Sequence, residues 1–398
     1  MLKFTANTIT PPTAVLPPNP PVAIDTKVLH IVNGEHFSGA ERVQSHLGRC
    51  LPKFGIQADF ACLKPGKFAA MVKDNNGEWG IAHDACMTSR IDLRPVKQVQ
   101  NLVREHNYQL LHAHTPRAAM ITAVASTLSR TPWIYHVHSP ASRDSLSKIT
   151  NQVKAWIEKQ SLRGASHLIT VSERLRLDCV VKGVSEDRVT VVHNGVPEIR
   201  PTRSKTPQPG GKWTIGMVAL MRPRKGLEVL LNALAKLEGQ GIDVLLRCIG
   251  PFQTEQYRQS IENQIERLGI GHQVEMIGFT DDVPKALSQL DAMVLPSVCG
   301  EGLPMMVLEA MAAALPVIAT RVEGTPEAIT HGVEGLVAEP SDPDSLANEI
   351  AALVSGKHDW QAMAEAACDR HHRCFSDLAM SSGTADVYRR LLSGARQL

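Results

Sequence analysis

The sequence has no long apolar run. Its longest apolar stretches, such as residues 118–128, are about 11 residues long and contain threonine. A membrane-spanning helix needs about 18 or more consecutive apolar residues. Residues 1–26 also lack the apolar run of a secretory signal, and they carry proline at positions 11, 12, 17, 18, 20 and 21. We therefore expect no membrane span, and we interpret residues 1–26 as a disordered, proline-rich leader.

The sequence also lacks an excess of either charge and any C-x-x-C pair. Its 42 basic and 40 acidic residues leave a net charge of +2, so the overall charge does not favour nucleic-acid binding. With 43% hydrophobic and 21% charged residues, the composition is that of an ordinary globular protein and excludes a disordered or fibrous one. The eight cysteines are scattered, several of them in apolar runs, which predicts buried free thiols in a reducing cytosol.

Short apolar runs alternate with longer segments of helical periodicity on both sides of a polar stretch. The runs are continuous, so the strands are expected to be buried on both faces, as in parallel sheets covered by helices. A length of 398 residues favours two large domains. The strand candidates are residues 28–32, 56–62, 110–113, 133–137, 167–171, 189–192, 214–219, 244–249, 274–277, 292–295 and 317–319.

We therefore predict an α/β fold with two Rossmann-like domains that face each other across a cleft. Ligands of such folds bind at the carboxyl ends of the strands. The expected N-terminal domain spans residues 27–198 and the expected C-terminal domain residues 213–375. The linker is residues 199–212, which are polar and rich in proline and glycine. Residues 376–398 are expected to form a helix that crosses the domain junction.

The loop and helix at residues 296–312 carry the strongest chemical signal. The N–H groups of Gly302 and Leu303 would lie at the positive end of the helix, where a diphosphate can bind. Glu301 precedes the helix and Glu309 lies inside it, so both carboxylates can border one pocket and accept hydrogen bonds from sugar or ribose hydroxyls. Acids that merely complement the helix dipole are the alternative.

The spacing of Glu301 and Glu309 resembles the E-x7-E motif of retaining GT-B glycosyltransferases, in particular family 4. Residues 315–320 and 324–329 are similar to that family's continuation, and the resemblance extends over nearly the whole chain from residue 27. It implies a transferase that moves a hexose-type sugar from a UDP- or GDP-linked donor to an acceptor hydroxyl with retention. The C-terminal domain would hold the nucleotide sugar and the N-terminal domain the glycan or lipid-linked acceptor.

The family's functional residues fall on matching positions here. By this resemblance Glu301 binds donor-sugar hydroxyls, Glu309 binds the ribose hydroxyls, and the amides of Gly302 and Leu303 contact the sugar and the diphosphate. These roles are expectations that the resemblance implies.

Residues 219–226, ALMRPRKG, resemble the family's G-R-L-x-x-x-K-G turn. Lys225 matches the lysine that neutralises the diphosphate, as a departing diphosphate requires. The family's arginine falls on Leu220, which is a departure, and Arg222 is the candidate that replaces its charge. A solvated turn is the alternative for this basic loop.

The N-terminal half adds two matches. Residues 38–42, SGAER, resemble the family's G-G-A-E-R loop, with Ser38 in place of the first glycine and Gly39 as a candidate donor-binding residue. His138 matches a histidine at a strand end near the transferred sugar. The resemblance therefore implies His138, Lys225 and Glu301 as the catalytic set. Residues 193–196 are interpreted as a plain turn that closes the first domain.

Three histidine- or aspartate-containing patterns could suggest a metal site. Two H-x-H pairs place both imidazoles on one strand face, but no cysteine or carboxylate of ligand spacing lies beside them. His371 and His372 with Cys374 lie in a segment that flanks a helix, and we expect no metal there either. The D-x-D at Asp342 precedes a helix and is interpreted as a cap. We expect no metal and no cofactor other than the donor substrate. The H-x-H pairs are His112 with His114 and His136 with His138.

Two other functions remain open at this point: a catalytically silent nucleotide-sugar-binding protein and a nucleotide-sugar epimerase. Family members often build cell-surface polysaccharide or glycolipid at the cytoplasmic side of a membrane, so the resemblance implies a cytoplasmic protein with peripheral contact to the inner face. Residues 143–163 combine basic and apolar residues at helical spacing. They suit an interfacial helix or, more commonly, a packed surface helix.

Overall fold

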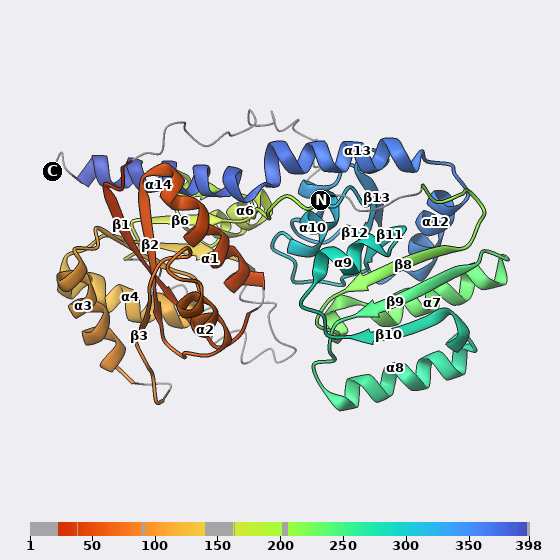
Figure 1. Ribbon diagram of the computed structural model, residues 1–398, viewed down its shortest axis with the longest axis horizontal. Coiled ribbons are helices and arrows are strands. Elements are labelled where there is room, and N and C mark those ends of the chain that lie inside the picture. Colours follow the sequence, from red (N-terminus) through yellow and green to blue (C-terminus); the bar gives the residue numbers. More distant parts are fainter. Residues whose placement is uncertain are drawn as a thin grey trace.

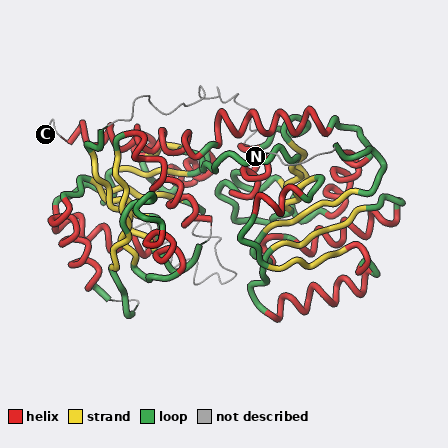
Figure 2. Tube along the Cα trace, in the orientation of Figure 1, coloured by secondary structure: helices red, strands yellow, loops and turns green. Residues whose placement is uncertain are grey.

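The structure is a computed structural model, and it describes residues 23–37, 39–89, 92–139, 162, 164–200 and 206–395. Most of the expected leader, Ser38, nearly all of segment 143–163 and part of the expected linker lie outside the described residues. The described chain forms two α/β units side by side, each with a sheet between helices (Figures 1 and 2). The fold class predicted from the sequence, two Rossmann-like domains, is confirmed.

The first unit holds a seven-stranded sheet whose strands are parallel and follow the order β3-β2-β1-β4-β5-β6-β7. Its strands are β1 (Thr26–Val32), β2 (Ile56–Cys62), β3 (Ala82–Asp84), β4 (Leu110–Ala113), β5 (Trp133–Val137), β6 (His167–Thr170) and β7 (Val189–Val191). Its helices are α1 (Gly39–Cys50), α2 (Lys67–Asp74), α3 (Arg94–His106), α4 (Pro116–Ser129) and α6 (Glu173–Val181), with short 3-10 turns η1 (Leu51–Phe54) and η3 (Glu186–Arg188).

The second unit holds a six-stranded parallel sheet in the order β10-β9-β8-β11-β12-β13. Its strands are β8 (Trp213–Val218), β9 (Val244–Ile249), β10 (Val274–Gly278), β11 (Ala292–Leu295), β12 (Val317–Thr320) and β13 (Gly335–Ala338). Its helices are α7 (Leu227–Gly239), α8 (Glu255–Leu268), α9 (Val283–Ser288), α10 (Met305–Ala312), α11 (Thr325–Ala328), α12 (Pro343–Val354) and α13 (Trp360–Arg370), with 3-10 turns η4 (Pro223–Lys225) and η5 (Gly271–Gln273).

The chain returns from the second unit to the first at its C-terminal end. After α13 it passes through a π-helical turn, η6 (His371–Phe375), into the long helix α14 (Asp377–Ala395), which lies along the first unit (Figure 1). The carboxylate of Asp377 pairs with Arg49 of α1, and Arg389 donates to the carbonyl of Phe54 at 2.8 Å. The final helix therefore packs on the N-terminal unit, and the crossing itself is made by η6.

Continuous apolar runs predicted eleven of the described strands to within two residues at each end. Most of these strands are buried on both faces, whereas β10 is half-buried to exposed along its length. Two strands were missed. β3 is only three residues long and partly exposed, and β13 begins at a glycine. Asp342 caps α12 as predicted, since its carboxylate accepts from the backbone N–H groups of Asp344 and Ser345 at 2.9 and 3.0 Å.

All eight cysteines are free, and four of them are buried. Burial raises the pKa of Cys50 to about 11 and the pKa of Cys62 and Cys248 to about 12, so these thiols stay protonated and unreactive. Among the described helices, none is both long and apolar enough to cross a membrane.

Candidate functional site

The loop between β11 and α10 places Glu301 in a buried, charge-paired position. Its carboxylate pairs with the ammonium group of Lys225 and accepts a hydrogen bond from Ser297 Oγ at 2.6 Å. Burial alone would raise the pKa of Glu301, but Lys225 and these hydrogen bonds outweigh it and hold the pKa below its ordinary value. Glu301 is therefore ionised at neutral pH, and one spot holds an anion and a cation.

The basic turn after β8 is joined to the same loop. Arg224 donates to the carbonyl of Gly300 at 2.5 Å, and its own carbonyl accepts from the N–H of Val298 at 2.9 Å. Gly226 ends the turn with a φ of 73°, and a Cβ there would lie 2.0 Å from the carbonyl oxygen of Pro296, so only glycine fits. This close approach fixes Lys225 against Glu301.

The departure at position 220 is visible in the same turn. Leu220 is exposed, whereas Arg222 is half-buried and directly precedes the 3-10 turn that contains Lys225. The sequence pattern did not single out Arg224, yet it is the arginine that holds the Glu301 loop. In the sequence, the only signal for Arg224 was its place among the three basic residues of this loop.

Glu309 lies on α10 of the second domain, and its carboxylate forms an ion pair with an arginine of the first domain. Arg42 of α1 pairs with Glu309 Oε1 although the two residues are 267 positions apart. Glu309 Oε2 is buried and has no hydrogen-bond partner among the described residues. One oxygen of this carboxylate is thus held, and the other is left as an acceptor, which suits a ligand hydroxyl.

The two domains meet at Gly302. A Cβ at this residue would lie 2.0 Å from the carbonyl oxygen of His138, at the end of β5, and 3.0 Å from Val171 at the end of β6. Leu303 is buried, and its carbonyl accepts from Asn194 Nδ2 at 2.9 Å. The predicted donor loop is therefore in direct contact with strand ends of the N-terminal domain, including the turn that was predicted to be a plain one.

Gly39 lies at the start of α1, where a Cβ would come within 3.8 Å of Met305 at the start of α10. The structure thus brings the first residues of the two helices together. The predicted site residues that the structure describes lie around one surface between the domains. Arg42, Ser297 and Arg224 lie there too, and the sequence pattern did not assign them to the site.

The H-x-H pairs lie together on the first sheet. His138 and His114 belong to a row of five histidines whose other members are His30, His112 and His136. Four of them are buried and His138 is half-buried. Two triads in this row have ligand atoms within 4.8 Å of one another. His114 Nε2 lies 2.9 Å from His30 Nδ1, and His114 Nδ1 lies 3.0 Å from His138 Nε2. These are hydrogen-bond distances, and they are shorter than the roughly 3.3 Å between two imidazole nitrogens bound to one tetrahedral zinc.

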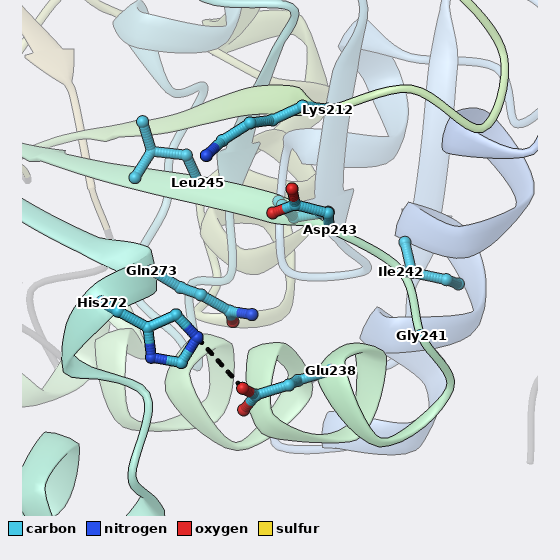
Figure 3. Close-up of a pocket in the computed structure, with 9 residues that line it drawn as sticks. Lys212, Glu238, Gly241, Ile242, Asp243, Leu245, His272 and Gln273 are labelled. Carbon is cyan, nitrogen blue, oxygen red and sulfur yellow. Dashed lines mark ion pairs between the residues drawn. The ribbon is translucent and has the colours of Figure 1, made fainter.

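A cavity of about 380 Å³ opens at the amino-terminal ends of strands in the second sheet, opposite the end that carries the Glu301 loop (Figure 3). It is lined by residues that precede β8, β9 and β10, among them Lys212, Asp243 and Gln273. His272 and Glu238 face each other across it at 3.1 Å. The cavity lies at the amino ends of the strands, so it is separate from the loops that carry Lys225 and Glu301.

A glycosyltransferase of the GT-B class is defined by this combination of two facing Rossmann-like units and a loop of E-x7-E spacing between them. Two family models match the chain: "Glycosyltransferase Family 4" over residues 37–200 and "Glycosyl transferases group 1" over residues 198–370. Together they cover both domains, and the chain belongs to glycosyltransferase family 4.

Known proteins agree with this assignment. An uncharacterised glycosyltransferase of Methanocaldococcus jannaschii is 29% identical over 64% of this chain and 67% of its own. A UDP-Gal:alpha-D-GlcNAc-diphosphoundecaprenol alpha-1,3-galactosyltransferase of Escherichia coli is 22% identical over 83% of this chain and 88% of its own. The crystal structure of Anabaena Alr3699/HepE with UDP and glucose matches with a TM-score of 0.79 at 22% identity, covering 92% of this chain and 100% of that one, which supports the fold.

Proposed function

We propose that this glycosyltransferase moves a hexose-type sugar from a UDP- or GDP-linked donor to an acceptor hydroxyl, with retention of the anomeric configuration and without a metal ion. The observation that carries the proposal is the group of half-buried Lys225 with buried Glu301 and Ser297 beside Gly302, where the second domain contacts His138. This group offers a cation for a diphosphate and a carboxylate for sugar hydroxyls within one interdomain site.

Each residue has a separate task in this proposal. Lys225, with Arg222 near it, stabilises the negative charge that develops on the departing diphosphate, and the amides of Gly302 and Leu303 contribute there. Glu301 orients the sugar, and His138 accepts a hydrogen bond from it. Gly39 lets the start of α1 approach the donor. The donor phosphate itself takes the proton of the acceptor hydroxyl on the face where the diphosphate leaves, so the protein contributes position and charge.

The nucleotide end is assigned to Glu309. Its buried, partnerless Oε2 accepts a ribose hydroxyl while Arg42 holds and orients the carboxylate through Oε1. This arrangement lets a ribose bind without displacing Arg42.

The proposed acceptor is a growing polysaccharide or a lipid-linked glycan. Support comes from the names of relatives, which include the diphosphoundecaprenol galactosyltransferase and a phosphatidyl-myo-inositol mannosyltransferase of Mycobacterium leprae that is 25% identical over 67% of this chain. Cytoplasmic location and contact with the inner face of a membrane belong to the same proposal. Sedimentation with anionic lipid vesicles, but not with neutral ones, is the expected result for such contact.

The first test is a thermal-shift screen with UDP, GDP, ADP, UDP-sugars and GDP-sugars, each with and without EDTA. A ligand that binds only the folded state raises Tm according to its concentration relative to Kd. We expect one base to raise Tm equally with and without EDTA, and we expect Glu309→Gln to lose that shift. Lys236→Ala is the control, because Lys236 pairs with Asp344 on the surface. Loss of the shift in EDTA would contradict metal independence, and no shift with any nucleotide would contradict the donor site.

A further inference from the structure

The buried histidines form one face of the first sheet. Neighbouring strands β1 and β4 place His30 opposite His112, and β4 and β5 place His112 opposite Ile134. Because side chains alternate along a strand, His114, His136 and His138 lie on this same face. His30, His112, His114 and His136 are buried and His138 is half-buried. The side chain of Tyr388 on α14 reaches the same face.

Four of these groups are joined end to end by hydrogen bonds. Tyr388 Oη lies 3.3 Å from His30 Nε2, His30 Nδ1 lies 2.9 Å from His114 Nε2, and His114 Nδ1 lies 3.0 Å from His138 Nε2. The ring planes of the two histidine pairs are nearly parallel, at 16° and 21°, with centroids 5.0 and 5.3 Å apart. The rings therefore meet through their nitrogen edges, in the direction of the lone pairs.

A neutral imidazole has one N–H donor and one bare nitrogen, so the direction of one hydrogen bond in such a chain sets all the others. Burial lowers the pKa of His30 to about 3 and that of His138 to about 4, and it lowers the pKa of His114 well below its ordinary value. All three rings are neutral at pH 7. Burial also raises the pKa of Tyr388, so its phenol keeps the proton.

The two contacts of Tyr388 give the direction. Its oxygen lies 2.6 Å from His112 Nδ1 and 3.3 Å from His30 Nε2. An O–H donor makes shorter hydrogen bonds than an N–H donor, so the phenol donates to His112 and accepts from His30 Nε2–H. His30 Nδ1 is then bare and accepts from His114 Nε2–H. His114 Nδ1 is bare in turn and accepts from His138 Nε2–H.

We propose that Tyr388, His30 and His114 are positioning residues that hold His138 in the tautomer whose Nδ1 presents a lone pair to a hydroxyl of the donor sugar. His138 Nδ1 is buried and has no hydrogen-bond partner among the described residues, and the backbone of His138 touches Gly302 of the donor loop. This inference rests on the proposed function for the sugar, whereas the tautomer itself is a property of the protein alone.

The test combines histidine 15N NMR with kinetics. Protein labelled at its histidine rings, with signals assigned through single His→Gln variants, reports which nitrogen of His138 carries hydrogen. We expect a bare Nδ1 in the wild type and a mixture of tautomers in Tyr388→Phe and in His114→Gln. We also expect kcat for UDP-glucose, UDP-galactose or a GDP-sugar to fall about tenfold in both variants, the worth of about one hydrogen bond, with the donor KM within about twofold.

The matched control is Tyr108→Phe. It also removes a buried phenol, one that donates to Asp59 at 2.7 Å and whose ring lies beside His83 and His106. It lies outside the hydrogen-bonded chain of Tyr388, His30, His114 and His138, called the relay, so it should leave the His138 tautomer and kcat unchanged. An Nδ1–H tautomer in the wild type, or a His138 tautomer that neither variant alters, would overturn the proposal. A wild type that turns over no nucleotide sugar would refute the proposed function, and the NMR result would still decide the relay.

Discussion

Both carboxylates of the candidate site are already paired with a cation before any donor arrives. Glu301 is paired within its own domain by Lys225, and Glu309 is paired by Arg42 from the other domain. Removing one member of a buried pair leaves an uncompensated charge, which is strongly destabilising. A variant at these positions therefore needs separate measurements of stability and of activity.

Lys225→Ala is expected to lower kcat about 100-fold or more while the donor KM rises less, because its ammonium group meets charge that develops mainly as the diphosphate departs. Steady-state kinetics with varied donor, alongside Tm, measure this. Lys236→Ala, on the surface of the same domain, should change neither value. An unchanged kcat with only a raised KM would assign Lys225 to ground-state binding instead.

At the scale of elements, two arginines of helix α1 form ion pairs with two different helices. Arg42 pairs with Glu309 on α10, and Arg49 pairs with Asp377 on α14. We expect Arg42→Met to raise the Kd for the donor nucleotide about tenfold or more, because Glu309 loses both its orientation and its counter-charge. Arg49→Met should lower Tm without changing that Kd. Isothermal titration calorimetry on both variants measures the difference, and equal effects would show that only the stability of α1 matters.

The histidine face makes the first sheet sensitive to mild acid. The buried rings have lowered pKa values, with His30 at about 3 and His138 at about 4, whereas an unfolded histidine titrates near 6.5. The unfolded chain therefore takes up protons that the folded chain refuses. The contribution of these histidines to the free energy of unfolding is fully present above pH 6.5. It decreases as the pH drops below 6.5, by up to about 1.4 kcal/mol per pH unit for each histidine.

His136 gives the sharpest form of this prediction, because neither ring nitrogen has a partner among the described residues and burial also lowers its pKa. His136→Leu should be at least as stable as the wild type at pH 7.5, since it removes unsatisfied polar atoms. Between pH 6.5 and 5.5 its free energy of unfolding should fall less than that of the wild type. The difference is the contribution of one titrating histidine, about 1 kcal/mol. Urea unfolding at these pH values measures both effects, and the difference between the two proteins should be constant from pH 7.5 to 8.5.

Elements were predictable from the sequence wherever local pattern decides them. The run 292–295 became β11 with the same bounds because both faces of this inner parallel strand are buried. The loop with Glu301 was also locally encoded. The pairing of Arg42 with Glu309 and the meeting of His30 with His114 depend on strand order and domain contact across 267 and 84 positions. No local spacing contains that information.

At the scale of the whole molecule, Glu327 ties the two domains together. It extends from the second domain, and its carboxylate accepts from the backbone N–H groups of Glu173 and Arg174 at 2.7 and 2.9 Å, at the start of α6 in the first domain. A carboxylate at a helix N-terminus satisfies free N–H groups and complements the helix dipole. His193 lies 3.3 Å from the same carboxylate.

Because this one side chain caps a helix of the other domain, Glu327→Ala should loosen the domains from each other. We expect scanning calorimetry to show two separated unfolding transitions in the variant, and the donor nucleotide should raise the temperature of only the one that belongs to the second domain. Glu339→Ala is the control, since Glu339 pairs with Arg321 inside that domain. If Glu327→Ala unfolds in the same single transition as Glu339→Ala, the contacts around Gly302 couple the domains without Glu327.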